Sequence, residues 1–215
     1  QSRLDRKLDD LRGMEAGLIR VGTFASVATN WLPAVIKKFS EIYPKIDFEV
    51  LYGDYLTIEN WILKGRVDCG FLRYPTNTML QSFFLAQDKL VVILPEDHPY
   101  ADCTFFPLEK LHQERFILLE EGLENEILEI FAEQKINPKI CFRAWDNQII
   151  ISMVENGLGI SILPELTLRR TPYRILKKEL SKKYSRKICI SLRNIKYAAT
   201  ATKHFIEYIQ KAELE

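Results

Sequence analysis

Residues 154–164 read VENGLGISILP, and this stretch predicts a change from helix to strand within a few residues. Gly157 falls where the residue after a helix turns left-handed, and Gly159 permits close backbone packing as a strand begins. The apolar run that follows ends at Pro164, which cannot continue a strand ladder or a helix. Other αβ units end a helix in this way, and the third glycine of a dinucleotide fingerprint is missing. The stretch therefore predicts an α/β unit but no dinucleotide-binding turn.

The residues upstream of this stretch predict a strand–helix–strand–helix series. Apolar patterning indicates strands at 116–119 and 140–145, with a helix at 121–135 between them. The helix that reaches Gly157 spans 146–155, and Asp146 is its expected N-cap. Residues Ile127, Leu128, Phe131 and Ile136 are expected to face inward from the first of these helices.

The first third of the chain predicts another alternating series. The expected elements are strand 18–22, helix 31–43, strand 46–52, helix 54–63 and strand 67–72. Ser26, Thr29 and Asn30 are good N-cap residues for the first helix, Asp54 for the second, and Gly65 ends the second. A βαβαβ order predicts a parallel sheet with helices on both faces.

The remaining segments indicate that the chain returns to its first part. Residues 80–94 are mostly β-like but interrupted at 86–88, and 177–186 is a polar, basic loop region. A strand at 187–192 and a helix at 198–209 follow the second series without belonging to it. Periodicity alone gives an α/β protein with two sub-sheets.

Composition limits the classes of function. The 215-residue chain is 47% hydrophobic and carries a net charge of +1, so it supports a real core but lacks the basic excess of a nucleic-acid binder. It contains no run long enough to cross a membrane and no signal-like start, and because it begins at Gln1 we expect it to be part of a longer protein.

No catalytic or metal-binding set is apparent in the sequence. Cys69 and Cys189 lie in apolar runs and are expected to be buried free thiols. His98 lies between two prolines and is better explained as a turn residue than as a catalytic group. We therefore expect neither an enzyme, nor a cofactor, nor a metal site.

Three motifs resemble those of LysR-type transcriptional regulators, in their effector-binding domain. Val154–Pro164 is similar to their V-x-x-G-x-G-I-x-x-x-P signature, and the Y-P…G…L-x-x-G-x-x-D pattern spans Tyr43 to Asp68. Pro95–Ala101 resembles their P-x-x-H-P-L-A loop, with Tyr100 in place of leucine. The resemblance covers Leu18 to about Gln210.

The resemblance implies a type-2 periplasmic-binding-protein-like fold: two α/β lobes, two crossover segments and an interlobe cleft. Residues 1–17 would end a linker helix, residues 18–86 and 192–215 would form lobe I, and residues 87–191 would form lobe II. Leu4, Leu8 and Leu11 fall on one helical stripe, as a coiled-coil seam requires.

Ligands of open α/β sheets bind at the carboxyl ends of strands, and the resemblance implies that matching positions line an effector cavity. The candidate effector-binding residues are Ser26, Thr29, Asp54, Arg73, Tyr74, Glu120, Glu121, Gly122 and Asp146. Alternatives remain for several of them, because Ser26, Thr29, Asp54 and Asp146 are also expected helix caps. Trp145, beside Asp146, is more often a packing residue. The acids among these residues leave room for an amine or amino acid rather than a simple dianion.

The leading interpretation is a cytoplasmic effector-binding and oligomerisation domain that senses a small polar metabolite. An extracytoplasmic solute-binding protein and an enzyme of the same fold are the alternatives. Helices 31–43 and 147–156 carry apolar residues beyond one stripe, including Trp31, Tyr43 and Ile149–Ile151, and predict a homodimer. The full-length protein would be a tetramer and would contact DNA only through a helix-turn-helix upstream of Gln1. Arg73 and Asp146 are expected to meet across the cleft.

Overall fold

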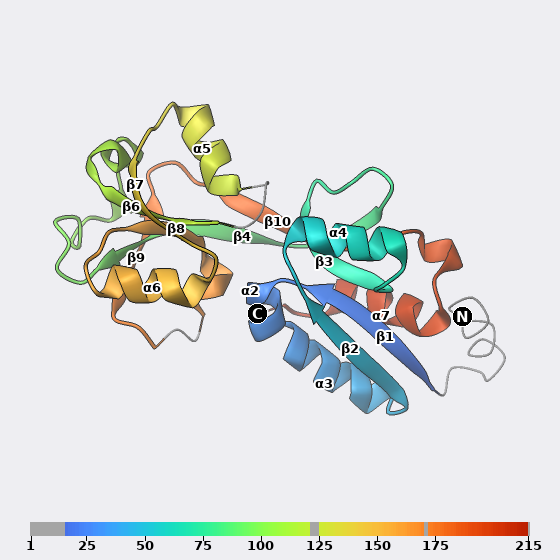
Figure 1. The fold of residues 1–215 in the computed structure, drawn as a ribbon. Coiled ribbons are helices and arrows are strands. Elements are labelled where there is room, and N and C mark those ends of the chain that lie inside the picture. Colours follow the sequence, from blue (N-terminus) through green and yellow to red (C-terminus); the bar gives the residue numbers. More distant parts are fainter. Residues whose placement is uncertain (1–15, 121–124, 170–171, 215) are drawn as a thin grey trace. The chain divides into compact units, whose positions relative to one another are not determined.

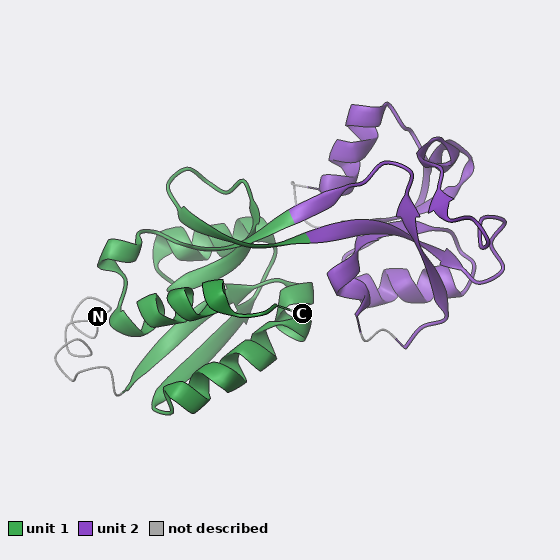
Figure 2. Ribbon diagram, turned by 180° about the vertical axis from the view of Figure 1, so that it is seen from behind, with its two compact units in different colours: residues 1–87, 187–215 green, residues 88–186 purple. Residues whose placement is uncertain are grey.

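The computed structural model describes residues 16–120, 125–169 and 172–214. The chain divides into two compact units (Figure 2): residues up to 87 with those from 187 onward form unit 1, and residues 88–186 form unit 2. The sequence placed the two boundaries at 86/87 and 191/192. The prediction of a linker helix before Gly17 falls mostly outside the described residues.

Unit 1 is built on a mixed sheet with the strand order β2-β1-β3-β10-β4. β1 pairs in parallel with β2 and β3, as predicted, and β10 runs antiparallel to β3. Its elements (Figure 1) are β1 (Gly17–Thr23), α2 (Ala25–Asn30), α3 (Leu32–Ile42), β2 (Ile46–Tyr52), α4 (Tyr55–Lys64), β3 (Cys69–Tyr74), the first half of β4 (Gln81–Pro95), most of β10 (Ser185–Leu192), the 3₁₀ turn η3 (Ile195–Tyr197) and α7 (Thr200–Lys211).

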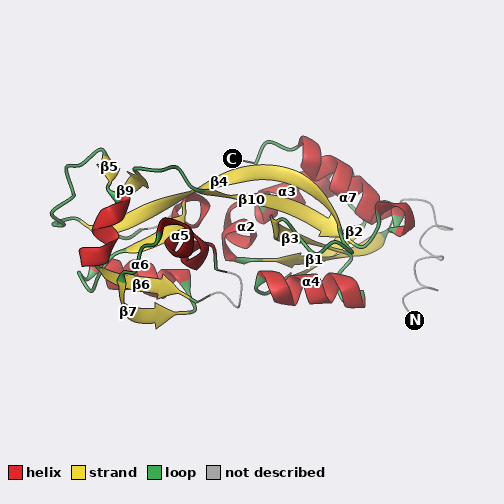
Figure 3. Cartoon of the chain, turned by 90° about the horizontal axis from the view of Figure 1, so that it is seen from above, coloured by secondary structure: helices red, strands yellow, loops and turns green. Residues whose placement is uncertain are grey.

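Helices cover both faces of this sheet, as the βαβαβ order predicts (Figure 3). On one face Phe39 of α3 packs edge-to-face against Phe205 of α7, with ring centroids 5.4 Å apart. On the other face α4 approaches so closely that a Cβ on Gly70 would come within 2.6 Å of Ile58 Cγ2. Glycine at this position of β3 therefore sets the distance between helix and sheet.

The segment before α3 differs from the prediction. Ser26, Thr29 and Asn30 do not cap α3 but belong to the separate short helix α2, whose N-cap is Phe24. Trp31 is the residue between the two helices, and α3 begins there without a side-chain cap. Propensity favoured a cap because serine, threonine and asparagine compete with helix backbone, whereas here the side chains of Thr29 and Asn30 bond back to carbonyls within α2.

β4 is one continuous strand, so the expected interruption at 86–88 is wrong. Polar Gln87 and Asp88 are tolerated because Asp88 is buried against Arg186 of β10, with Arg186 Nη2 2.8 Å and Nε 3.0 Å from Asp88 Oδ2. Asp88 Oδ1 also accepts a hydrogen bond from the Leu166 amide. The unit boundary falls inside both β4 and β10, so these strands are the two crossover segments that the fold implies.

Unit 2 contains a parallel β6–α5–β7 unit beside strands that pair with β4. β4 is flanked by antiparallel β8 and β9, and β5 pairs with β9. Its further elements are β5 (Phe105–Phe106), η1 (Leu108–Gln113), β6 (Arg115–Leu119), α5 (Glu126–Gln134), β7 (Lys139–Ala144), α6 (Asn147–Glu155), β8 (Ser161–Pro164), η2 (Glu165–Leu168) and β9 (Ile175–Leu180). β6 and β7 pair in parallel, as predicted.

The apolar strand β4 serves two cores in unit 2, because successive side chains point to opposite faces. Leu90, Val92 and Leu94 pack in one core with α5, whereas Val91 and Ile93 pack in the other with α6. This explains why its apolar run is continuous rather than alternating.

The turn from α6 into β8 has the predicted structure. Gly157 is left-handed at φ 68°, and a Cβ on Gly159 would collide with the carbonyl oxygen of Arg115. This close approach is stabilised by hydrogen bonds, because the Ile160 amide donates to Arg115 O and the Ile117 amide donates to Ile160 O. The strand that follows, β8, is buried throughout.

Two predictions for unit 2 are wrong. The basic segment 177–186 is not a loop, since β9 extends to Leu180 with its lysines on a paired strand. α5 begins at Glu126 with Asn125 as its cap, and its inward residues include Ile130 rather than the exposed Leu128. Tertiary pairing overrides local polarity in the first case. In the second case Ile127, Phe131 and Ile136 are buried as predicted, and only Leu128 lies outside the apolar stripe that they form with Ile130.

Candidate functional site

The candidate residues of unit 1 follow the carboxyl ends of three neighbouring parallel strands. Ser26 and Thr29 come after β1, Asp54 follows β2, and Arg73 and Tyr74 end β3. Because the strand order is β2-β1-β3, these residues share one edge of the sheet. An edge of this kind is where ligands bind in open α/β sheets.

The residues after β1 are held by bonds within α2. Ser26 is buried, and its carbonyl accepts a hydrogen bond from Asn30 Nδ2 at 2.9 Å. Thr29 is exposed, and its hydroxyl donates to the Ala25 carbonyl at 2.9 Å. Neither side chain caps α3, so the capping alternative for Ser26 and Thr29 is wrong.

Asp54 is the N-cap of α4, as predicted, and its Oδ1 accepts a hydrogen bond from the Thr57 amide at 2.7 Å. Beside it, Tyr55 packs edge-to-face against Phe24, with centroids 5.0 Å apart. Arg73 is half-buried on β3, opposite Ile188 of β10, and Tyr74 is mostly exposed. This edge of unit 1 therefore carries one guanidinium and one carboxylate that is already bonded to a helix.

The candidate residues of unit 2 follow the parallel strands β6 and β7. Glu120 is the residue after β6, and its Oε2 lies 2.8 Å from Arg143 Nη1 of β7. Asp146 caps α6, as predicted, with Oδ1 accepting from the Gln148 amide at 2.7 Å. Glu121 and Gly122 lie outside the described residues. Two carboxylates of the described residues thus lie at one edge of unit 2.

Trp145 is 71% exposed, so its interpretation as a packing residue is wrong. It lies between the end of β7 and Asp146, at the same edge as Glu120. A large aromatic ring left in water at the carboxyl edge of a sheet offers a flat surface to a ligand or a partner. The sequence signal was its position directly before a helix cap.

Arg143 and Asn125 are two further residues of this edge that sequence reasoning missed. Asn125 accepts from the amides of Ile127 and Leu128 and donates from Nδ2 to the Leu119 carbonyl at 2.6 Å, which fixes the start of α5 relative to β6. An asparagine before a Glu-Ile-Leu run is a capping signal. Arg143 had no such signal, because its partner Glu120 lies 23 positions away.

The buried thiols of Cys69 and Cys189 and the imidazole of His98 have structural explanations. Burial raises the pKa of the Cys69 thiol, with a further contribution from the charge of Asp68, and burial also raises the pKa of Cys189. Protonated thiols are poor nucleophiles. His98 accepts from the Tyr100 amide at Nδ1 and contacts Glu114 through Nε2, as a turn residue would. Within the described ranges no cluster of three metal-ligating side chains occurs, and no helix is long and apolar enough to cross a membrane.

The fold resembles those of a solved regulatory domain and a solved effector-binding domain. The regulatory domain of Synechocystis PCC6803 CcmR, in complex with 2-PG, superposes with a TM-score of 0.83 at 20% identity over 90% of this chain and 96% of that one. The effector binding domain of QuiR, in complex with shikimate, gives a TM-score of 0.81 at 22% identity over 91% and 96% of the two chains. The type-2 periplasmic-binding-protein-like architecture is thus confirmed.

The sequence model of the LysR substrate binding domain matches residues 12–213, and the chain belongs to this family. It is 30% identical over 198 residues to YvbU, an uncharacterized HTH-type transcriptional regulator of Bacillus subtilis (strain 168), covering 91% of this chain and 68% of YvbU. It is 28% identical over 172 residues to the transcriptional dual regulator GltC of the same organism, covering 78% and 57%. The chain is therefore the effector-binding domain of a LysR-type transcriptional regulator, and the solute-binding-protein alternative is not favoured.

Proposed function

We propose that the carboxyl edges of the two units form the effector site, and that the effector carries both a carboxylate and an ammonium group. The supporting observation is the charge on the described part of the two edges: Arg73 on unit 1, and on unit 2 Asp146 beside Glu120, which is already paired with Arg143 at 2.8 Å. A guanidinium binds a carboxylate through two parallel hydrogen bonds, and carboxylates beside an exposed indole suit an ammonium group. An amino acid satisfies both edges, whereas a dicarboxylate would meet the acids of unit 2.

The site would also act as a switch. Arg73 and Asp146 belong to different units, and we expect them to pair across the cleft when no effector is bound. An effector carboxylate would then compete for Arg73 and favour a different arrangement of the units. A ligand shifts such an equilibrium only through its different affinity for the two states, which is what allostery requires.

The experiment is a calorimetric screen of the common amino acids and their decarboxylated and deaminated analogues against residues 1–215. We expect an amino acid to bind, and both analogues to bind more weakly. Arg73→Ala should reduce affinity by about tenfold or more, since hydrogen bonds to charged groups contribute about 1.5–3 kcal/mol. Arg20→Ala is the matched control, because Arg20 is an exposed arginine on β1 that is paired with Glu49 at 3.1 Å.

If the deaminated acid binds as tightly as the amino acid, the ammonium group does not contribute to binding and that part of the proposal is wrong. Unchanged affinity in Arg73→Ala would remove Arg73 from the site. The pairing itself is tested by a double-mutant cycle: if Asp146→Asn and Arg73→Ala change the affinity additively, the two residues do not interact.

The domain would also form a homodimer. The sequence argument needs correction here, because Trp31 is only 4% exposed and Ile150 and Ile151 are fully buried within their own units. The exposed apolar residues of the two helices are instead Ile42 on α3, at 57%, and Ile149 on α6, at 53%. Ile42→Glu or Ile149→Glu should convert a sedimenting dimer into a monomer, and a wild-type monomer at tens of micromolar would contradict the proposal.

The whole protein would act as a non-enzymatic regulator in the cytoplasm. The chain spans about two thirds of the length of YvbU and a little over half of GltC. Specific DNA contact would therefore come from a helix-turn-helix outside these residues, and a tetramer would form in the full-length protein. Residues 1–215 alone, at a net charge of +1, should not retain an operator fragment at physiological salt.

A further inference from the structure

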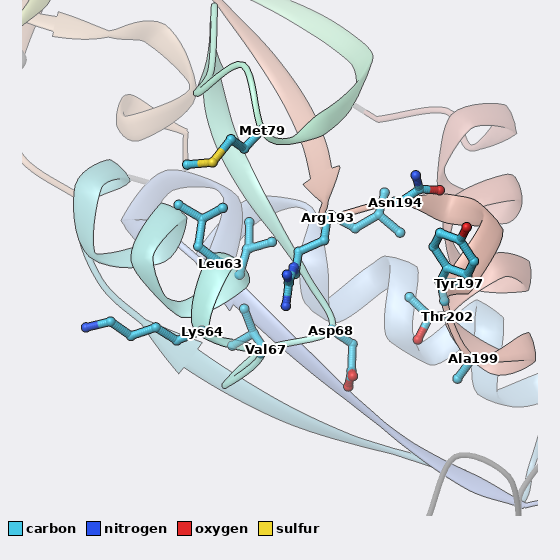
Figure 4. Close-up of a pocket in the computed structure, with 14 residues that line it drawn as sticks. Leu63, Lys64, Val67, Asp68, Met79, Arg193, Asn194, Tyr197, Ala199 and Thr202 are labelled. Carbon is cyan, nitrogen blue, oxygen red and sulfur yellow. The ribbon is translucent and has the colours of Figure 1, made fainter. Parts of the chain in front are cut away.

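Unit 1 contains a cavity of about 570 Å³ at the edge of the sheet opposite the candidate site (Figure 4). It lies between the end of α4, the turn leading into β3, the residues after β10 and the start of α7. Ser191 of β10 pairs with Gly70 near the start of β3, which places the end of β10 at the amino edge of β3. The candidate effector residues follow the carboxyl ends of β1, β2 and β3, so the cavity is a separate feature.

The size and lining of the cavity fit a small molecule. Sites for small ligands typically enclose about 300–1,000 Å³ and combine apolar walls with a few polar groups. Leu63 and Val67 form part of the wall, and the mostly exposed side chains of Met79 and Tyr197 also line it. Large apolar side chains gathered around one opening are typical of a binding surface.

Two polar side chains in the cavity are available to a ligand. The Arg193 guanidinium points into it (Figure 4), and among the described residues Arg193 makes no hydrogen bond or ion pair. Thr202 of α7 is only 2% exposed and also lines the cavity, yet its hydroxyl has no hydrogen-bond partner within the described part of the chain. The Thr202 hydroxyl is not among the buried side-chain atoms that lack a hydrogen-bond partner, so it opens to the cavity, where a ligand can bond to it.

The charges of the lining define the ligand further. The ammonium of Lys64 points away from the cavity, which leaves Arg193 as the cation directed inward. Asp68 also lines the cavity, and its Oδ2 accepts a hydrogen bond from the Arg20 amide at 2.9 Å. A guanidinium attracts one carboxylate, whereas a second anionic group on the ligand would be repelled by Asp68.

We propose that this cavity is a second small-molecule site, and that it binds a monocarboxylate with an aryl or branched aliphatic body. Arg193 binds the carboxylate through its guanidinium, and the Thr202 hydroxyl donates a further hydrogen bond to it. The apolar body lies against Leu63, Val67 and Met79. The site is independent of the proposed amino-acid site, because it uses none of the same residues.

Methionine-methyl NMR tests the proposal with a probe inside the cavity and another outside it. The chain has three methionines; Met79 lines the cavity, Met153 lies on α6 in unit 2, and Met14 lies outside the described residues. The signals are assigned with Met79→Leu and Met153→Leu. Phenylacetate and 3-methylbutanoate are titrated as probes, with phenylacetamide as the uncharged analogue.

We expect the acids to shift the Met79 methyl signal saturably while the Met153 signal stays unchanged. Arg193→Gln should weaken binding by about tenfold or more, because a charge-assisted pair is lost. Lys64→Gln is the matched control, and it should leave affinity unchanged. Thr202→Val keeps the side-chain shape, and it should weaken binding of both acids.

Several results would overturn the proposal. No saturable Met79 shift with either acid would exclude the site, and equal binding of phenylacetamide would exclude a carboxylate ligand. Loss of the Met79 response in Arg73→Ala would place the acids at the candidate effector site instead. Since Arg193 is exposed, Arg193→Gln is expected to fold, and an unchanged set of dispersed methyl signals verifies this.

Discussion

Asp88 and Arg186 form a buried ion pair in unit 2. Their side chains are 6% and 3% exposed, and the pair joins β4 to β10 where both strands leave the unit. Asp88→Ala removes the carboxylate that lies 2.8 Å from the guanidinium, whereas Glu126 Oε1 lies 4.0 Å from it. It also removes the acceptor of the Leu166 amide, which anchors the turn after β8.

The expected cost follows from burial. Removing one partner of a buried pair costs about 3–5 kcal/mol, because an uncompensated charge remains in a poorly hydrated site. Most domains are stable by only about 5–15 kcal/mol, so Asp88→Ala should lose a large part of the stability of unit 2. Replacing both residues by apolar ones avoids the stranded charge, so Asp88→Leu with Arg186→Met should be less destabilised than Asp88→Ala.

Urea unfolding followed by far-UV circular dichroism, at one fixed protein concentration, measures these differences. Glu49→Ala is the matched control, since it breaks the Arg20–Glu49 pair, whose side chains are about half exposed, and should cost about 0–1 kcal/mol. If Asp88→Ala costs no more than Glu49→Ala, the pair does not stabilise the crossover. Asp88→Leu and Arg186→Met are also measured as single variants. If the double variant loses as much stability as the two single variants lose in sum, the two charges are not coupled.

The two glycines of the turn after α6 should respond differently to alanine. Gly157→Ala should cost about 1–2 kcal/mol, because φ is 68° and a Cβ meets open space. Gly159→Ala should cost clearly more, because its Cβ would collide with the Arg115 carbonyl and β6 would have to move. Equal unfolding midpoints of the two variants would contradict this contact. Cys103 and Cys141 should react with a disulfide reagent in the native protein at neutral pH. Cys69 and Cys189 should react only after unfolding, since burial raises both their pKa values; four equally fast thiols would refute this assignment.

Local chemistry explains which parts of the fold were predictable. Asp54, Gly65, Asp146 and Gly157 set helix ends through bonds within a few residues, and each has the predicted role. The parallel strands of unit 1 also followed from the order of the elements.

The wrong predictions concern residues whose structure depends on partners that are distant in the sequence. Asp88 interrupts an apolar strand in sequence, but the strand continues because Arg186, 98 positions away, neutralises the charge. The lysine-rich segment of β9 was predicted to be a loop, but it forms a strand because it pairs with β4 and β5. Trp31 suggested a partner surface, yet it is buried in its own unit. A sequence pattern cannot give these partners without the fold.

The part of the candidate effector site that lies on each unit could be predicted separately. Each edge of a sheet could be assigned from topology, because the carboxyl ends of parallel strands meet at one side. The proposed ligand class rests on charges from both units, since Arg73 is on unit 1 and the acids Glu120 and Asp146 are on unit 2. Arg143 already pairs with Glu120, so among the described residues at this edge Asp146 is the carboxylate that accepts its hydrogen bonds from backbone amides. A ligand ammonium would therefore be expected to bind Asp146 and the exposed face of Trp145, and Trp145→Ala should weaken binding of the amino acid more than that of its deaminated analogue.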